Sequence, residues 1–325
     1  MQAFEYARAK STQDAVKLLG DSEAVPLAGG TDLISLMKDG VAAPKRLVSL
    51  QHVGELKGIT LRGGGLRLGA GVTLEELMES AEVREHYPAL IQAAEGVSSP
   101  QIRSTGTVGG DLCQRPRCWY YRAGYGLLAT DKGKPLVPEG DNRYHAILGN
   151  SGPAYFVSPS SLAPILIALD AKVHLEGPGG KREMDVKDFF VTPQKEGDSE
   201  HALHAGEIVT EVTVPHPGDA KMAVYEVRQK EALDWPLAAA AAVLMLNGGS
   251  VASARIVMGH VAPVPWPSPE AEDALKGKTV DEDSAWEAGK AALSKATPLS
   301  HNAYKVQLAR VAVKRAILRA AKGEA

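Results

Sequence analysis

LAGGTDL, residues 27–33, follows the apolar run 24–26 and precedes apolar residues at 33, 34, 36 and 37, spaced like the inner face of a short helix. Glycine lets the main chain approach a ligand closely, because it has no Cβ and tolerates positive φ. Where such a corner leads into a helix, unpaired N–H groups and the positive end of the helix dipole point to one place, which suits an anion. The stretch predicts either an anion-binding corner or a plain structural turn.

A second glycine-rich loop, STGTVGGD at residues 104–111, offers small residues, hydroxyl groups and free amides. Asp111 is placed to receive ribityl or ribose hydroxyls. Two such loops could grip the two phosphates of one dinucleotide. Neither contains the Gly-Lys-Ser/Thr of a Walker loop or the GxGxxG of a Rossmann unit, which disfavours ATP-type phosphoryl transfer and a standard NAD site.

Composition narrows the class of protein. The chain has 325 residues, of which 44% are hydrophobic and 23% charged, and its formal net charge is -3. Two or three packed units are expected, and nucleic acid is an unlikely partner. The longest uncharged apolar run, 235–247, is shorter than the roughly 20 residues of a membrane helix, and the start MQAFEYARAK has no secretory signal.

The chain contains two cysteines, Cys113 and Cys118. This scarcity fits a cytoplasmic, reducing compartment. Two thiols cannot supply the four thiolates of an ordinary iron–sulfur cluster, so any such cluster must belong to another chain.

Apolar periodicity and turn residues predict the order of the elements. Ser11 with Asp14, and Thr73 with Glu76, indicate capped helices. Alanines 238–242 suit a helix by propensity, but the following Asn-Gly turn favours a buried strand. Helices are expected at 11–20, from 73, at 82–95, 161–169 and 301–322, strands at 45–50, 172–175, 208–214, 222–227, 237–246 and 251–258, a hairpin at 59–68, and a domain seam at 215–221.

The closing helix carries basic residues and no acid. Its apolar side is expected to hold Tyr304, Leu308, Val311 and Leu318, and its charge comes from Lys305, Arg310, Lys314, Arg315, Arg319 and Lys322. A solvated basic face is the leading interpretation, and a docking surface for an acidic partner is the alternative.

Several motifs in this order resemble a known family. They are AGGTDL at 28–33, QIRSTGTVGGDL at 101–112, SSLAPILIALDA at 160–171, GEIVTEVTVP at 206–215 and YEVRQKEALDWPLAAAA at 225–241. The chain is similar, over nearly its whole length, to the FAD-binding medium subunit of the xanthine dehydrogenase and aldehyde oxidoreductase family of molybdenum hydroxylases.

The resemblance implies an α+β fold. An FAD-binding domain of the vanillyl-alcohol-oxidase/PCMH type is expected at 1–217, with two α/β subdomains at about 1–56 and 57–217 and a loop insertion near 113–155. A smaller C-terminal domain at 218–325 is expected to contain a three-stranded antiparallel sheet and helices.

The resemblance also implies a function. This chain would hold FAD, a large subunit would hold the molybdenum cofactor, and a small subunit would hold two [2Fe–2S] clusters. A dimer of heterotrimers would be one arrangement of these subunits, and electrons would leave FAD for an external acceptor. Such transfer depends on placing and tuning the flavin and needs no acid–base residue on this chain. A stand-alone FAD-dependent oxidoreductase and a flavin-free scaffold subunit are the rival hypotheses.

By resemblance, the cofactor site has a defined set of residues. The two loops would hold the pyrophosphate and its sugars, Ile102 would lie against the cofactor, Leu162 and Leu203 would lie near the flavin rings, and Arg228 or Lys230 could place positive charge near the pyrimidine ring, with a solvent-facing charge as the alternative. The loop residues are Leu27, Ala28, Gly29, Gly30, Thr31, Asp32 and Leu33, followed by Gly106, Thr107, Gly110 and Asp111.

The insertion and two substitutions depart from the pattern. CQRPRCWYYR and EGDNRYHAILGN resemble a branch of the family in which four cysteines bind a [4Fe–4S] cluster, but only Cys118 of that ligand set is present. The tract is therefore expected to be a surface loop braced by residues 119–122, with partner docking as the second possibility. Ser161 and Glu226 stand where relatives often carry an acid and a lysine, and His145 and His260 lack a partner at metal-ligand spacing.

Overall fold

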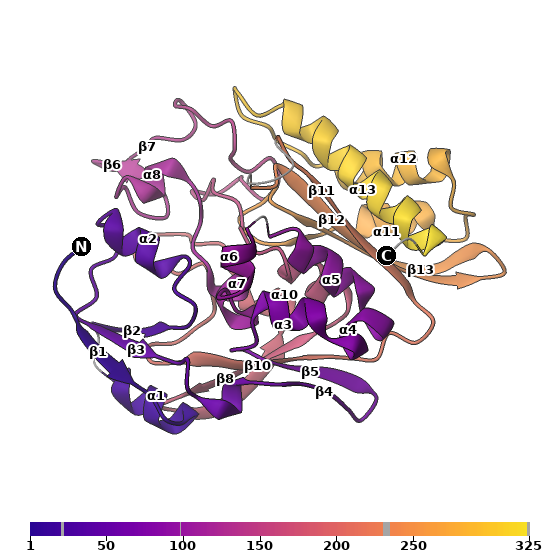
Figure 1. Cartoon of the computed structure of the whole chain (residues 1–325). Helices are drawn as coiled ribbons and strands as arrows, with labels where there is room; N and C mark the ends of the chain where they lie inside the picture. The colour runs from indigo at the N-terminus through magenta and orange to yellow at the C-terminus, as the bar shows by residue number, and fades with distance from the viewer. Residues whose placement is uncertain (21–22, 98, 230–234, 324–325) are drawn as a thin grey trace.

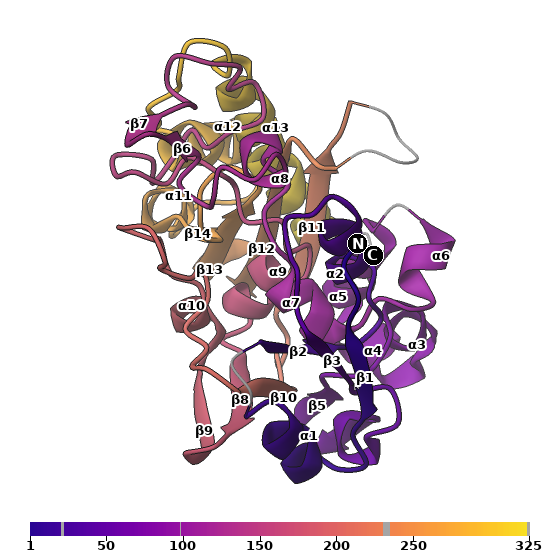
Figure 2. The ribbon, with the colours of Figure 1, turned by 90° about the vertical axis from the view of Figure 1, so that its left-hand side faces the viewer.

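The computed structural model describes residues 1–20, 23–97, 99–229 and 235–323. It contains three main sheets arranged along the molecule, with the N-terminal sheet at one end and the C-terminal sheet at the other (Figures 1 and 2). Among the described residues, no helix combines the length and apolar character needed to cross a bilayer.

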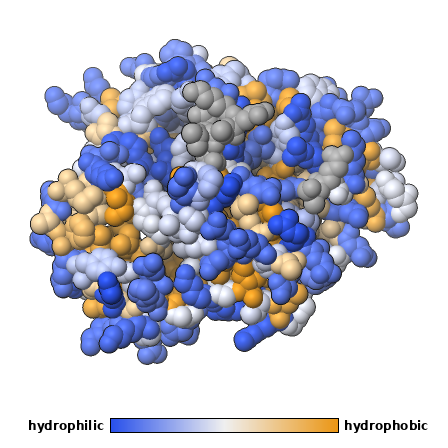
Figure 3. All heavy atoms as spheres, in the orientation of Figure 1, coloured by the Kyte–Doolittle hydropathy of each residue, from blue (hydrophilic) through white to orange (hydrophobic). Residues whose placement is uncertain are grey.

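The N-terminal sheet is parallel, in the order β1-β3-β2. Its core is small, and apolar side chains gather on the surface over this end of the molecule (left side of Figure 3). Small units bury a smaller fraction of their surface, which explains the exposed apolar residues here. The elements are β1 (Glu5–Arg8), α1 (Thr12–Leu18), β2 (Ala24–Leu27), α2 (Leu33–Lys38), β3 (Arg46–Ser49) and the 3₁₀ helix η1 (Gly54–Leu56).

The central sheet is antiparallel, in the order β4-β5-β10-β8-β9, and its apolar residues belong to the largest core. Its strands are β4 (Ile59–Arg62), β5 (Gly65–Gly69), β8 (Lys172–Gly177), β9 (Gly180–Asp185) and β10 (Ile208–Val214). Its helices are α3 (Leu74–Glu79), α4 (Ala81–His86), α5 (Pro88–Glu95), α6 (Pro100–Arg103), α7 (Val108–Cys113), α9 (Ala163–Ala168) and α10 (Val186–Phe189).

The insertion contains little regular structure, namely α8 (Trp119–Arg122), β6 (Thr130–Asp131) and β7 (Lys134–Pro135). It lies between the N-terminal end and the C-terminal helices (Figure 1). Asn142 joins it to the C-terminal part, because its Nδ2 donates to Ser300 Oγ at 2.9 Å and its Oδ1 accepts from the His301 N–H at 2.9 Å.

The C-terminal sheet has four antiparallel strands in the order β11-β12-β13-β14, rather than the expected three. The missed strand, β14, contains only Trp266 and Pro267, which is too short to show a period of two. The elements are β11 (Lys221–Val227), β12 (Ala238–Asn247), β13 (Ser250–Gly259), β14 (Trp266–Pro267), α11 (Pro269–Leu275), α12 (Glu282–Ala292) and α13 (Tyr304–Lys322).

The alanine strand β12 is buried on both faces. Ala240 and Ala242 belong to the core under α13, whereas Ala241 belongs to the central core. Small side chains let elements approach from both sides, which explains a strand made of a helix-forming residue.

Two helix predictions are wrong in detail. The helix expected at 82–95 is two helices, because Pro88 has no N–H and Tyr87 before it leaves the helical conformation. The buried face of α13 is not the expected one, since Tyr304 is 42% exposed and Lys305 is buried. The packed face consists of Lys305, Ala309, Ala312, Val313, Ala316, Ile317 and Ala320.

The other basic side chains of α13 lie against aromatic rings. Arg319 and Arg315 stack on Tyr225 with guanidinium carbons 4.6 and 5.0 Å from the ring centroid, and Arg310 lies 5.5 Å from the centroid of Trp286. Lys314 pairs with Glu282 of α12, so the basic face is held by aromatic rings and by one acid. These contacts leave both sequence interpretations of the face open.

We expect Ala240→Leu to destabilise the protein by about 1–3 kcal/mol, because the added carbons have no space between β12 and α13. The measurement is the thermal unfolding midpoint. Met245→Leu, on an exposed position of the same strand, is the control and should change stability by less than about 0.5 kcal/mol. Equal midpoints for both variants would contradict the tight packing.

Candidate cofactor site

A cavity of about 1420 Å³ lies where the N-terminal sheet, the central part and the insertion meet. Both glycine corners line it. Of the expected site residues, it includes Leu27, Ala28, Gly29, Gly30, Thr31, Asp32, Leu33, Gly106, Thr107, Gly110 and Leu203. Ile102, Asp111 and Leu162 do not line it, and Lys230 lies outside the described residues.

The two corners touch through their main chains. A Cβ on Gly29 would lie 1.9 Å from the carbonyl oxygen of Thr105, a separation that real Cβ atoms do not show. Gly30 has φ of 73°, the left-handed conformation that glycine adopts at little cost. The glycines of the first corner are therefore required by the close contact and by the turn.

The first corner presents a row of unpaired donors. None of the main-chain N–H groups of residues 29–33 donates a hydrogen bond to a described residue. These groups line the cavity, so their partners must come from outside the chain. A diphosphate supplies several acceptor oxygens in the short span that such a row requires.

The second corner differs from the sequence expectation of free amides. Gly106 N–H donates to Ile102 O at 2.6 Å, Gly109 N–H to Ala70 O at 2.8 Å and Gly110 N–H to Thr107 Oγ1 at 3.1 Å. Among the described residues of this loop, Thr107 keeps an unpaired main-chain N–H facing the cavity. This corner is thus mainly a rigid wall, in which the glycines permit internal packing.

Asp111, which was expected to contact a sugar, makes hydrogen bonds within the chain and does not line the cavity. Its carboxylate accepts from Ser160 Oγ at 2.5 Å and from the N–H of Leu162 at 3.0 Å. Burial raises its pKa, although these hydrogen bonds act in the opposite direction. Asp111 therefore fastens α7 to the start of α9, and Leu162 beside it is fully buried in the central core.

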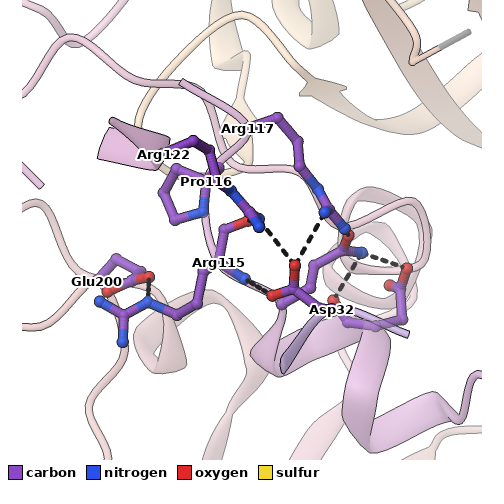
Figure 4. Close-up of polar contacts among 8 residues, drawn as sticks. Asp32, Arg115, Pro116, Arg117, Arg122 and Glu200 are labelled. Atoms are coloured by element: carbon purple, nitrogen blue, oxygen red, sulfur yellow. Dashed lines mark hydrogen bonds and ion pairs between the residues drawn. The ribbon is translucent and has the colours of Figure 1, made fainter. Parts of the chain in front are cut away.

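Asp32 connects the first corner to the insertion (Figure 4). Its carboxylate accepts from the main-chain N–H of Arg115 at 2.7 Å and pairs with Arg117 and Arg122, each at 2.8 Å. Only 15% of the Asp32 side chain is exposed, so these contacts cover most of its surface. Asp32 thus points its main chain toward the cavity and its side chain toward the insertion.

Arg115 is a cavity residue that the sequence reasoning missed. Its Nε lies 2.5 Å from Glu200 Oε1, and Glu200 is only 4% exposed (Figure 4). Burial raises the pKa of Glu200, and the charge of Arg115 counteracts that rise. The basic run QRPR beside the glycine loop was the available signal, but nothing in it separates Arg115 from Arg117.

Other missed residues line the same cavity. They include the thiol of Cys113, whose pKa is raised to about 12 by burial and by Glu200 and Asp111, so that it stays protonated. Both cysteines are free thiols. Others are Tyr121, the turn 124–128 of the insertion, and the segment 195–199.

Glu226 and Arg228 form a buried ion pair. Arg228 Nη2 also donates to the carbonyl of Gly96, which attaches this pair to the end of α5. Burial raises the pKa of Glu226, while Arg228 lowers it. Arg228 is therefore neither a free positive charge nor a solvent-facing one.

Comparison with known proteins identifies the family. Residues 2–217 match the family described as FAD binding domain in molybdopterin dehydrogenase, and residues 223–320 match CO dehydrogenase flavoprotein C-terminal domain. The chain belongs to this FAD-binding family. The family membership, the α+β fold class, the FAD cofactor and the oxidoreductase class predicted from the sequence are thereby confirmed.

Curated relatives and solved structures agree with this assignment. The chain is 31% identical to the aldehyde oxidoreductase FAD-binding subunit of Escherichia coli, covering 95% of this chain and 96% of the relative. It is 30% identical to the carbon monoxide dehydrogenase medium chain of Hydrogenophaga pseudoflava, covering 97% and 96%.

Among solved structures, a Cu,Mo-CO dehydrogenase chain matches with a TM-score of 0.79 at 28% identity, covering 99% of both chains. Quinoline 2-oxidoreductase from Pseudomonas putida 86 matches with a TM-score of 0.78 at 27% identity, covering 99% of this chain and 98% of that one.

We expect Gly29→Ala to weaken FAD binding at least about tenfold, because the new Cβ forces the two corners apart. The dissociation constant of FAD is measured by calorimetry on the flavin-depleted chain. Gly54→Ala is the control, since a Cβ there meets no atom within 4 Å. If both variants bind FAD like the parent chain, the contact does not shape the site.

We expect Asp32→Asn to loosen the insertion and to cost about 2 kcal/mol, because two partly buried guanidinium groups lose their counter-charge. Limited proteolysis should cut the region 115–128 faster, and the unfolding midpoint should fall. Asp39→Asn, at the other end of α2, is the control. An unchanged cleavage rate in Asp32→Asn would show that the insertion is held by other contacts.

Proposed function

We propose that the unpaired N–H groups of residues 29–33 hold the diphosphate of FAD. The observation that supports this most directly is the row of unsatisfied main-chain donors inside a cavity that is large enough for a nucleotide. The N–H of Thr107 adds a donor from the facing corner. Of the other expected contact residues, those that line the cavity, Leu203 among them, are candidates for contacts to the rest of the cofactor.

We further propose that Arg115 supplies the positive charge of this site. Its guanidinium group is held from behind by Glu200, and its main chain is held by Asp32. A cation fixed in this way lowers the free energy of a bound diphosphate without having to be ordered on binding. The turn 124–128 and the segment 195–199 restrict the access of water to the cavity.

The proposed role is that of an electron-transfer subunit. Bound FAD supplies the capacity to accept and release electrons singly or in pairs. The residues of this chain bind and orient it, and none of them is assigned an acid–base role. Electrons would arrive from [2Fe–2S] clusters of a small partner subunit and leave to an external acceptor.

The named relatives support a multi-subunit assembly, because they are medium chains or FAD-binding subunits. We propose a large subunit with the molybdenum cofactor, the small iron–sulfur subunit, and a dimer of heterotrimers. A cytoplasmic location is proposed from the two free thiols.

Purification of the native complex tests this function. We expect the chain to be yellow, to release FAD on denaturation, and to co-purify with two other polypeptides that contain molybdenum and iron. Bleaching of the isolated chain by a substrate, without partners, would favour a stand-alone oxidoreductase. A colourless chain that does not take up FAD would favour the scaffold hypothesis.

We expect Arg115→Gln to weaken FAD binding about tenfold, which corresponds to one lost charge-assisted contact. The dissociation constant is measured at low and high salt, and the difference between parent and variant should shrink at high salt. Arg143→Gln is the matched control, because Arg143 belongs to the same insertion but pairs with Asp141 outside the cavity. Equal affinities would remove Arg115 from the site and leave the proposed function intact.

A further inference from the structure

A second cavity, of about 220 Å³, lies between the insertion and the C-terminal part. It shares no lining residue with the cofactor cavity, and the proposed function does not use it. Cys118, Trp119 and His145 of the insertion line one side, and Trp235, His260 and Lys305 line the other.

One cation in the lining of this cavity lacks an acidic partner. Of the two described cations there, Arg117 pairs with Asp32 outside the cavity, whereas Lys305 has no described acid beside it. Lys305 is 1% exposed, and its Nζ donates to the carbonyl oxygens of Tyr144, His145 and His260 at 3.3, 3.0 and 2.9 Å. These dipoles hold the amine in place, burial lowers its pKa to about 7, and no described acid pairs with it. An anion in the cavity would supply the missing counter-charge.

Two buried imidazoles in the wall have unused ring nitrogens. His260 is 2% exposed and its Nε2 has no described partner. His145 Nε2 lies 3.1 Å from Cys118 Sγ, and its Nδ1 has no described partner. Burial, reinforced by Lys305, lowers the pKa of His260 to about 3 and that of His145 to about 4, so both rings are neutral. A neutral imidazole can donate one hydrogen bond, and leaving a buried polar atom unpaired costs free energy.

The remaining walls are aromatic. Trp119 and Tyr144 meet edge to face with centroids 5.4 Å apart, and Arg117 stacks on Trp235 at 4.1 Å. Phe156 closes another side. An apolar cavity of roughly 150 Å³ holds a benzene molecule, so this volume suits one aromatic ring with a small substituent.

We propose that this second cavity binds a monocyclic aromatic carboxylate, with its ring among Trp119, Tyr144 and Trp235 and its carboxylate toward His260 and the charge of Lys305. The aromatic walls account for the ring, and Lys305, which has no described acid partner, accounts for the negative charge. An inorganic anion would satisfy the charge but leave the apolar walls uncovered.

Calorimetry on the flavin-loaded chain tests the ligand class with three probes. Benzoate has both features, benzamide keeps the shape without the charge, and inorganic phosphate has charge without a ring. We expect benzoate to bind 1:1 and at least about tenfold tighter than either other probe. Benzamide lacks the charged contact, and phosphate lacks the ring. Equal binding of benzamide or of phosphate, or no saturation by benzoate, would overturn the proposal.

Thiol alkylation locates the site. Each cavity contains one cysteine, Cys113 in the cofactor cavity and Cys118 in the second. Benzoate should slow the reaction of Cys118 with N-ethylmaleimide, followed by mass spectrometry, and leave the rate at Cys113 unchanged. Protection of Cys113, or of neither thiol, would place benzoate elsewhere.

Two variants test the named contacts. His260→Phe removes the hydrogen-bond donor but keeps an aromatic ring. Trp235→Ala removes one wall of the cavity. Because Trp235 is 43% exposed, this second variant keeps the test valid if His260→Phe does not fold. Each should weaken benzoate binding about tenfold. Tyr6→Ala, an exposed aromatic on β1, is the control and should bind like the parent chain. Parent-like affinity in Trp235→Ala would contradict the assignment.

Discussion

The main-chain contact between Gly29 and Thr105 is the constraint on which the cofactor site depends. It brings together a loop of the N-terminal sheet and a loop of the central part that are far apart in sequence. Because Gly29 has no side chain, the two loops meet there backbone to backbone. The donors of residues 29–33 remain unpaired there, and the diphosphate that we propose as their partner would satisfy them.

The same loop also holds the insertion. The backbone at Asp32 belongs to the cavity wall, whereas its carboxylate binds Arg117, Arg122 and the main chain of Arg115. The insertion is supported at both of its ends. Ion pairs to Asp32 at one end and hydrogen bonds from Asn142 at the other attach it to both halves of the molecule. The second cavity lies in the space that this bridging leaves beside Cys118.

Where sequence reasoning went wrong, a neighbour from elsewhere in the chain was the cause. Lys305 looked like a surface charge, but carbonyl oxygens of the insertion and of the loop after β13 surround it. The packed face of α13 consists mostly of alanines, because the facing strand leaves little space, whereas Tyr304 is exposed and Leu308 is only partly buried. Asp111 has the residue type of a sugar-binding group, yet Ser160 and Leu162 occupy its oxygens.

The sequence by itself determined the family, the order of nearly all elements and the first glycine corner, because glycine positions, caps and apolar periods are local properties. It could not determine that most main-chain N–H groups of the second corner donate hydrogen bonds within the chain, or that the Asp32 side chain faces the insertion. Nor could it determine that Arg115 rather than Arg117 lines the cofactor cavity. These outcomes depend on which acceptor or carboxylate lies within bonding distance of each group in the folded chain. Only the packing of distant segments decides that, because hydrogen bonds and ion pairs act over a few ångströms in space and not along the chain.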